Sequence, residues 1–204
     1  MKLLITGANG FVGKNFLYFL KNRGIRIELV CTFNTEPPND DELLAGAQWI
    51  KIDLNEKQMT FKLIRDTHVS HILHLAAQSS VSNSYTEPFH TFSNNINPTL
   101  NILEAARIYN PAVKLLVVSS AEIYGATQKI LTEKSPIKPR SPYAVSKYMQ
   151  EQVAETYLAS QNMKITIARP FNHIGPFQQR NFAIPSFISQ IKNQVKAKVG
   201  RVIL

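Results

Sequence analysis

The chain has 204 residues, of which 44% are hydrophobic and 18% charged, a composition typical of a folded globular protein with a sizeable core. No apolar run approaches the roughly 18 residues that a membrane-spanning helix needs. Cys31 is the single cysteine, which excludes an intrachain disulfide and a cysteine-based metal site. We therefore expect a cytoplasmic protein with no membrane partner and no bound metal.

The net charge of +9 is unevenly distributed, because Glu155 is the last acidic residue and all later charged residues are Lys or Arg. A basic third of a chain can bind a polyanion, but this one lacks the aromatic–basic pattern of nucleic-acid-binding modules. We predict no nucleic-acid partner. Instead, we expect part of the positive charge to serve an anionic small molecule, and the chain to stop before a more acidic segment.

The first stretch, 2–6, is an apolar run of strand length that leads through a glycine-rich turn into residues at helical spacing. A strand that enters a helix through glycines is typical of a dinucleotide phosphate site. Gly7 permits the tight turn, Gly10 lets the backbone approach a pyrophosphate, and Gly13 lets helix and strand pack closely. The helix N-terminus then faces the anion. The candidate cofactor-binding residues here are Gly7, Asn9, Gly10, Phe11, Val12 and Gly13.

Strand-like and helix-like segments alternate along the rest of the chain. We predict strands over 25–31, 48–52, 71–75, 113–119 and 164–168, and helices over 56–67, 89–109, 142–159 and 182–195. Pro98 should kink the second of these helices or interrupt its start. Residues 199–204 read as the start of another strand.

This alternation predicts an α/β protein with a doubly wound parallel sheet of the Rossmann type and helices on both faces. We predict a dinucleotide-binding domain over 1–180 and, over 181–204, the start of a largely missing substrate-binding region. Ligands of such sheets lie beyond the carboxyl ends of the strands. Polar residues follow several predicted strands there, at 53, 76–80, 119–125 and 169–173.

Tyr143 and Lys147 are four residues apart and therefore share one face of a predicted helix. A lysine ammonium beside a phenol lowers the pKa of the phenol from ~10, which lets it donate or remove a proton at a carbonyl or alcohol. Ser120, at a strand end, is placed to hydrogen-bond the same oxygen. A Tyr–Lys pair alone is more often ordinary surface, but the glycine turn and Ser120 favour a catalytic site.

Together, the GxxGxxG spacing at 7–13, Ser120 and Tyr143-x-x-x-Lys147 resemble the extended short-chain dehydrogenase/reductase family, which acts on nucleotide-linked sugars. The likeness covers essentially the whole chain and includes HLAAQSSV (74–81), LNILEA (100–105) and IYG (123–125). It implies that Tyr143 is the proton donor or base, that Lys147 lowers its pKa and holds the nicotinamide ribose, and that Ser120 holds the reacting oxygen.

The resemblance also implies a wider set of binding residues. Asp53 would contact the adenine. The other cofactor-binding candidates, besides Tyr143 and Lys147, are Leu54, Leu75, Ala76, Ala77, Asn95, Pro170 and Phe171. The substrate-binding candidates are Gln78, Ser79, Ser80, Asn172 and His173.

Within the family, RPFNHIGP (169–176) and SFISQI (186–191) most resemble GDP-4-dehydro-6-deoxy-D-mannose reductases, which form GDP-D-rhamnose. The alternatives are GDP-mannose 4,6-dehydratase, UDP-glucuronate decarboxylase and UDP-sugar 4-epimerases. Glu122 supports the dehydratase alternative, because it stands where such enzymes carry a catalytic glutamate. It is equally well a plain hydrogen-bond acceptor. A catalytically silent dinucleotide sensor is the alternative of another class, and the intact Ser–Tyr–Lys set counts against it.

The end of the second predicted strand, CTFN (31–34), marks the cofactor poorly. It carries neither the acid that favours NAD nor the arginine that favours NADP. Because no acid is present to repel a 2′-phosphate, NADP is slightly favoured. Family members continue well past the length of this chain. We expect the protein to form a homodimer. We expect the 204-residue form to fold and to bind cofactor, but to be nearly inactive on a GDP-linked or other nucleotide-linked sugar.

Overall fold

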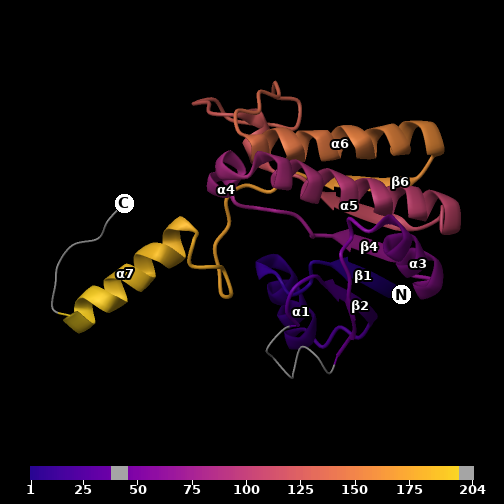
Figure 1. The fold of residues 1–204 in the computed structure, drawn as a ribbon, viewed down its shortest axis with the longest axis horizontal. Helices are drawn as coiled ribbons and strands as arrows, with labels where there is room; N and C mark the ends of the chain where they lie inside the picture. Colours follow the sequence, from indigo (N-terminus) through magenta and orange to yellow (C-terminus); the bar gives the residue numbers. More distant parts are fainter. Residues whose placement is uncertain (38–45, 198–204) are drawn as a thin grey trace.

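The structure, a computed structural model, describes residues 1–37 and 46–197. Its centre is a six-stranded sheet with the strand order β3-β2-β1-β4-β5-β6 (Figure 1), and every neighbouring pair is parallel. The strands are β1 (Lys2–Thr6), β2 (Glu28–Phe33), β3 (Gln48–Lys51), β4 (His71–His74), β5 (Lys114–Val118) and β6 (Lys164–Ala168). The predicted Rossmann-type sheet is confirmed.

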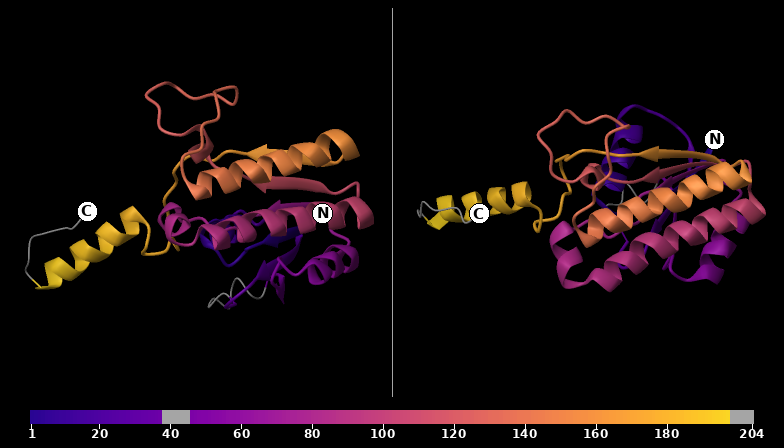
Figure 2. Two further views of the ribbon diagram at one scale, coloured as in Figure 1. Left: turned by 45° about the horizontal axis from the view of Figure 1, so that its top comes forward. Right: turned by 90° about the horizontal axis from the view of Figure 1, so that it is seen from above.

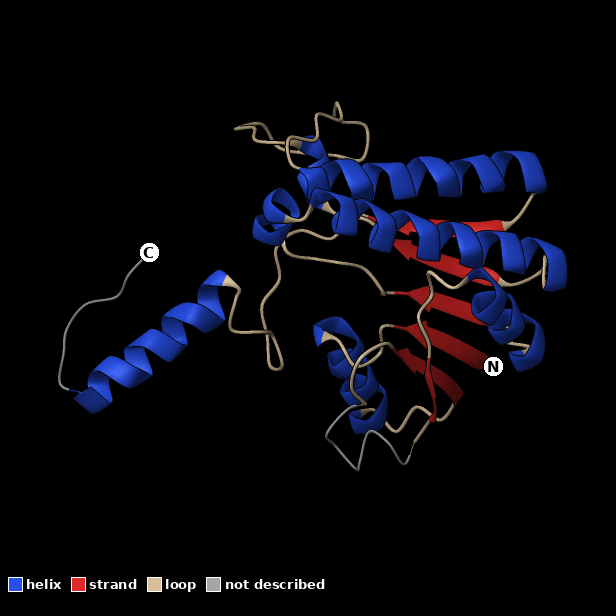
Figure 3. Cartoon of the chain, in the orientation of Figure 1, coloured by secondary structure: helices blue, strands red, loops and turns tan. Residues whose placement is uncertain are grey.

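Helices cover both faces of the sheet (Figure 3). They are α1 (Phe11–Asn22), α3 (Lys57–Thr67), α4 (Val81–Thr86), α5 (Pro88–Tyr109), α6 (Pro142–Gln161), α7 (Ala183–Ala197) and the 3-10 helix η1 (Ala121–Tyr124). Because successive strand side chains point to opposite faces, β1 contributes to two cores. Leu4 packs in the core shared with α3, α5 and α6, whereas Leu3 and Ile5 pack with Leu17 of α1.

The second strand begins later than predicted. The pattern placed it at 25–31, but β2 spans Glu28–Phe33. Residues 24 and 25 instead end the preceding helix: Gly24 has a φ of 62°, and the Ile25 N–H donates to the Leu20 carbonyl at 2.9 Å. Pairing with β1 therefore starts at Glu28, opposite Lys2.

The other predicted elements lie within two residues of their observed bounds, and β6 coincides with its prediction. Pro98 does not interrupt the helix, because α5 runs from Pro88 to Tyr109 with Pro98 buried inside it; the kink stays a prediction. The short α4 and η1 were not predicted. The predicted strand at 199–204 lies outside the described residues.

The last helix, α7, extends away from the sheet (Figures 1 and 2). The proposed division into a domain over 1–180 and a second region from 181 remains a prediction. No helix in the described parts of the chain is long and apolar enough to cross a bilayer.

Candidate active site

The carboxyl ends of the parallel strands meet at one edge of the sheet, where Figure 3 shows loops leaving the arrowheads. Backbone hydrogen bonds tie these loops together. The Leu75 N–H donates to the Thr6 carbonyl at 3.2 Å, and the Ala121 N–H donates to the Pro170 carbonyl at 3.0 Å. The structure thus brings the glycine turn and the segments after β4, β5 and β6 to the same edge.

The glycine turn leaves no room for side chains at two positions. A Cβ at Gly7, whose φ is 65°, would lie 2.9 Å from the Ala76 backbone, and a Cβ at Gly13 would lie 2.3 Å from the Ala8 carbonyl oxygen. At the start of α1, Gly10 provides no side-chain cap and the first turn contains no acidic residue. The N–H groups of that turn are therefore free to bind an anion, which fits the pyrophosphate of a dinucleotide.

Gly13→Ala is expected to lower the free energy of unfolding by on the order of 2–4 kcal/mol, because the added Cβ would force α1 away from β1. The affinity for a nicotinamide dinucleotide should fall at least tenfold with it. Urea unfolding and fluorescence titration of NADH measure the two effects. Gly46→Ala is the control, since a Cβ at Gly46 meets nothing within 4 Å. Unchanged stability and binding in Gly13→Ala would contradict this close-packing account.

The segment after β3 is held by side chains from α5. One carboxylate oxygen of Asp53 accepts from the Asn55 backbone at 2.9 Å and from its amide at 3.0 Å, and that amide also reaches Asn94 at 2.8 Å. The Leu54 carbonyl accepts from Asn101 at 2.9 Å. On the other side, the Asn9 amide donates to the Glu36 carbonyl at 2.7 Å. The cofactor-binding candidates Asn9, Asp53 and Leu54 are thus held by contacts that the sequence did not reveal.

A buried polar chain connects the glycine turn to the helices. His74 Nδ1 lies 2.7 Å from the Thr6 hydroxyl, and Nε2 lies 3.1 Å from the Thr99 hydroxyl. Because Thr99 donates to the Asn95 carbonyl, it must accept from His74, so the proton lies on Nε2 and Thr6 donates to Nδ1. Burial and the nearby Lys147 charge lower the pKa of His74 to about 3. His74 is therefore a neutral bridge between β1, β4 and α5.

Asn95 extends the same network to α6. Its Oδ1 accepts from the Gln78 N–H at 2.7 Å, and its amide donates to the Ser146 hydroxyl at 2.8 Å. Ser146 donates in turn to the carbonyl of Tyr143 at 2.7 Å. Asn95, a candidate cofactor residue, thus joins the loop after β4 to the first turn of α6.

Thr99→Val is expected to lower the free energy of unfolding by about 2–4 kcal/mol, because it leaves His74 Nε2–H and the Gln150 amide without their buried acceptor. Thr156→Val is the matched control: Thr156 also donates to the carbonyl four residues earlier, but it is exposed. Urea unfolding of both variants measures the difference. Equal small losses would show that the buried network contributes little.

Ser120, Tyr143 and Glu122 meet where β5 ends. Ser120 is 8% exposed and forms a side-chain hydrogen bond with Tyr143, while its hydroxyl also accepts from the Glu122 N–H at 3.2 Å. The prediction that Tyr143 has a lowered pKa was wrong for this structure. Burial and the Glu122 charge raise the pKa of Tyr143, and the hydrogen bond with Ser120 only partly offsets them.

Lys147 lies one turn further along α6 and is 3% exposed. Burial lowers the pKa of its ammonium to about 7, and the Glu151 carboxylate opposes that shift. Glu151, which was not predicted as a site residue, is fully buried and forms an ion pair with Arg169 at 2.7 Å. The signal was present, because Glu151 follows Lys147 by four residues and therefore shares its helix face.

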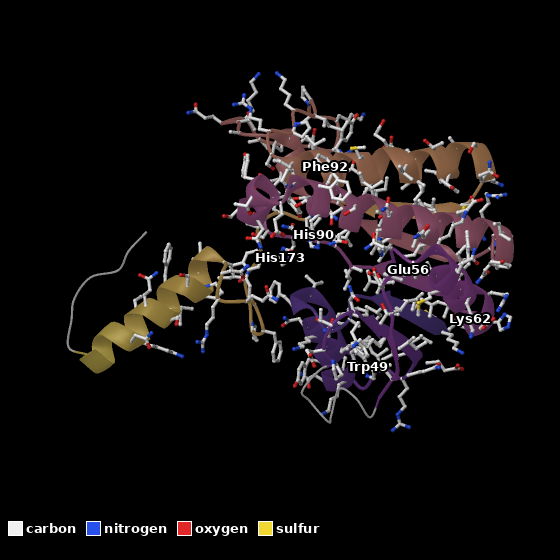
Figure 4. All side chains as sticks on the ribbon, viewed as in Figure 1. Trp49, Glu56, Lys62, His90, Phe92 and His173 are labelled. Atoms are coloured by element: carbon white, nitrogen blue, oxygen red, sulfur yellow. The ribbon has the colours of Figure 1, made fainter. Side chains whose placement is uncertain are left out.

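The segment after β6 packs on α1, which places it beside the glycine turn. The His173 ring stacks on Phe11 with centroids 5.5 Å apart, and the Asn15 amide donates to the Pro176 carbonyl at 2.9 Å. Figure 4 labels His173 on this segment, between the sheet and α7. Asn172 is exposed, and Phe171 is 60% exposed in the wall of a cavity of about 540 Å³ that the glycine turn does not line.

The loop after β4 holds the other substrate-binding candidates. Ser80 caps α4 by accepting from the Asn83 N–H at 3.2 Å, and Ser79 is exposed. Gln78 Oε1 and the Ser119 hydroxyl are buried and have no hydrogen-bond partner among the described residues, so they are free to bind a ligand group. The described residues contain no cluster of His, Cys, Asp or Glu that could hold a metal ion.

Comparison with known sequences agrees with this geometry. The family model for GDP-mannose 4,6 dehydratase matches residues 4–202. The chain is similar to GDP-6-deoxy-D-mannose reductase of Pseudomonas aeruginosa (31% identical, covering 93% of this chain and 58% of that protein). It is also similar to UDP-glucuronate 4-epimerase 1 of Arabidopsis thaliana (30% identical, covering 94% of this chain and 47% of that protein).

Solved structures of nucleotide-sugar enzymes also match this chain. A dTDP-glucose 4,6-dehydratase from Streptomyces venezuelae with NAD bound matches with a TM-score of 0.86 and 27% identity, covering 95% of this chain and 62% of that one. A UDP-glucose 4-epimerase from Thermus thermophilus with NAD matches with a TM-score of 0.85 and 29% identity, covering 98% of this chain and 64% of that one. The chain thus spans between 47% and 64% of the lengths of these relatives. It belongs to the extended short-chain dehydrogenase/reductase family of nucleotide-sugar epimerases, dehydratases and reductases.

Proposed function

We propose that this chain is the cofactor-binding and catalytic part of an NAD(P)-dependent reductase that converts GDP-4-dehydro-6-deoxy-D-mannose to GDP-D-rhamnose. The observation that carries the proposal is the meeting of Ser120, Tyr143 and Lys147 beyond β5, on the edge that also holds the glycine turn. The RPFNHIGP segment (169–176) and the similarity to the Pseudomonas reductase support a GDP-linked substrate.

Each residue has a distinct role in this proposal. The bound dinucleotide supplies the hydride. The first turn of α1 holds the pyrophosphate, and Lys147 holds a ribose hydroxyl. Ser120 hydrogen-bonds the C4 oxygen of the sugar, and Tyr143 donates the proton to it. The raised pKa of Tyr143 keeps the phenol protonated at neutral pH, which suits a group that must donate a proton to a ketone.

The cofactor proposal includes both NADP and NAD, with NADP slightly favoured by the absence of an acid at 31–34. The two solved relatives bind NAD, which supports NAD as the alternative. Fluorescence titration with NADPH and NADH tests the site. Saturable binding of at least one is expected, and binding of neither would overturn the cofactor site.

A GDP-mannose 4,6-dehydratase is the second candidate, and Glu122 is the observation that favours it. The charge of this exposed carboxylate acts on Tyr143, where a dehydratase needs a group that removes a proton from the sugar ring. The natural gene product that contains this chain should be assayed with GDP-4-dehydro-6-deoxy-D-mannose and, separately, with GDP-mannose. Turnover of the keto sugar supports the reductase; turnover of GDP-mannose alone supports the dehydratase.

We also propose that the protein is a homodimer. Large apolar side chains are exposed on α4 and α5, including Tyr85 at 61% and Phe89 at 85%, and such a surface is suited to a subunit interface. Light scattering coupled to size exclusion measures the mass. A monomer at micromolar concentration would contradict the proposal.

A further inference from the structure

Helix α6 presents three chemically active side chains at four-residue spacing, Tyr143, Lys147 and Glu151. This spacing places them along one helix face. Glu151 is 0% exposed and Lys147 is 3% exposed. A fully buried carboxylate is costly unless charged groups compensate it, so the surroundings of Glu151 bear on its role.

The direct partner of Glu151 is Arg169, at the end of β6. The guanidinium donates from Nε to both carboxylate oxygens at 3.0 and 3.1 Å and from Nη2 to one of them at 2.7 Å. Arg169 Nη1 donates to the Tyr124 hydroxyl at 2.8 Å and to the Glu133 carbonyl at 3.0 Å. Three hydrogen bonds from Arg169 therefore hold the Glu151 carboxylate, and Tyr124 and Glu133 hold the Arg169 guanidinium.

We propose that Glu151 is a positioning residue that keeps the Lys147 ammonium charged beside Tyr143, and that Arg169 limits this effect by sharing the same carboxylate. The assignment rests on the proposed function, in which Lys147 holds the ribose and supports proton donation. Glu151 itself touches neither Tyr143 nor the reacting atoms in this scheme.

The charges around Lys147 support this assignment. From β4 it faces His74, which is neutral, and from its own helix it has Tyr143, which is protonated at neutral pH, and Glu151. Glu122 of η1 acts on Tyr143. Within the described residues, Glu151 is the carboxylate that raises the pKa of Lys147 against the effect of burial. No ion pair within 4.0 Å joins the two, so the effect acts through space, where a buried charge is poorly screened.

Two variants should move the pKa of Lys147 in opposite directions. Glu151→Gln removes the charge that supports the ammonium, so this pKa should fall by about one unit. Arg169→Gln removes the competing cation and keeps an amide donor for the carboxylate, so this pKa should rise by a similar amount. A merely structural tie between α6 and β6 would not produce shifts of opposite sign.

The measurement is an NMR titration of the Lys147 13Cε resonance in the 204-residue protein, with Lys147→Met providing the assignment. The affinity for NADH, measured against pH, is the second readout. The pH at which half of this affinity is lost should be lowest in Glu151→Gln, intermediate in the wild type and highest in Arg169→Gln. Glu155→Gln is the matched control, because it removes an exposed carboxylate one turn further along α6 and should leave the midpoint unchanged. If Glu151→Gln does not fold, the double variant Glu151→Gln/Arg169→Gln, which removes both members of the buried ion pair, should have a lower Lys147 midpoint than Arg169→Gln alone.

Shifts in the same direction, or no shift in either variant, would overturn the assignment. The NMR result does not depend on cofactor binding. Failure to bind any dinucleotide therefore contradicts the proposed function alone, whereas an unmoved Lys147 midpoint contradicts the role of Glu151 alone.

Discussion

Tyr143→Phe is expected to lower kcat/KM for the 4-keto sugar by about 10²–10⁴-fold, because it removes the proposed proton donor and leaves the ring in place. The fold and the affinity for the dinucleotide should change little, since the helix and the first turn of α1 remain intact. Lost turnover with retained cofactor binding is the signature of a group that acts in the chemical step.

Steady-state kinetics of the natural gene product, combined with NADPH and NADH titrations, measure both parts of this result. Tyr148→Phe is the control, because it makes the same substitution on the same helix outside the proposed catalytic set. A Tyr143→Phe protein with full activity would refute the mechanism.

Lys147→Met is expected to make the protein more stable and less able to bind cofactor. Burial has lowered the pKa of this lysine from 10.5 to about 7, so the fold carries a penalty for holding the ammonium. Replacement by an apolar side chain of similar length should raise the free energy of unfolding by about 2–4 kcal/mol at pH 6. The affinity for the dinucleotide should fall in the same variant because the ribose loses its donor.

The burial penalty on the Lys147 ammonium should make the free energy of unfolding depend on pH. Between pH 7 and 10.5 the unfolded chain holds a proton on Lys147 that the folded protein has lost, so wild-type stability should rise with pH across that window. Below pH 7 the penalty is constant, and above 10.5 it is absent. Lys147→Met should remove this rise, whereas Lys164→Met, at an exposed position, should keep it. Parallel pH–stability curves for Lys147→Met and the wild type would show that the ammonium carries no burial penalty.

Local patterns were sufficient to predict most of the fold. The apolar run at 164–168 coincides with β6, and the glycine turn lies between β1 and α1 as its spacing indicated. The start of β2 was misplaced because Ile25 and Ile27 look like strand residues, yet Ile25 closes the end of α1 through its N–H. Apolar patterning does not distinguish the residue that ends a helix from the first residue of a strand.

The parts of the site that were not predicted depend on contacts between distant segments. Thr6 and His74 are 68 residues apart, and Thr99 and Gln150 are 51 apart, so spacing in the sequence could not reveal their hydrogen bonds. The pKa of Tyr143 was misjudged for a related reason. Helical spacing brought Lys147 near, but the burial of the phenol and the Glu122 charge depend on how η1 meets α6.

The central claim is that Tyr143 and a dinucleotide at Gly7–Gly13 together reduce the C4 carbonyl of a GDP-linked sugar. Transfer of deuterium tests it most directly. The natural gene product should be incubated with GDP-4-dehydro-6-deoxy-D-mannose and NADPH or NADH that carries deuterium at both C4 positions of the nicotinamide. We predict GDP-D-rhamnose carrying deuterium at C4 of the sugar, formed in step with cofactor oxidation and lost in Tyr143→Phe. A product without deuterium at C4, or cofactor that stays reduced while the sugar is consumed, would contradict the account.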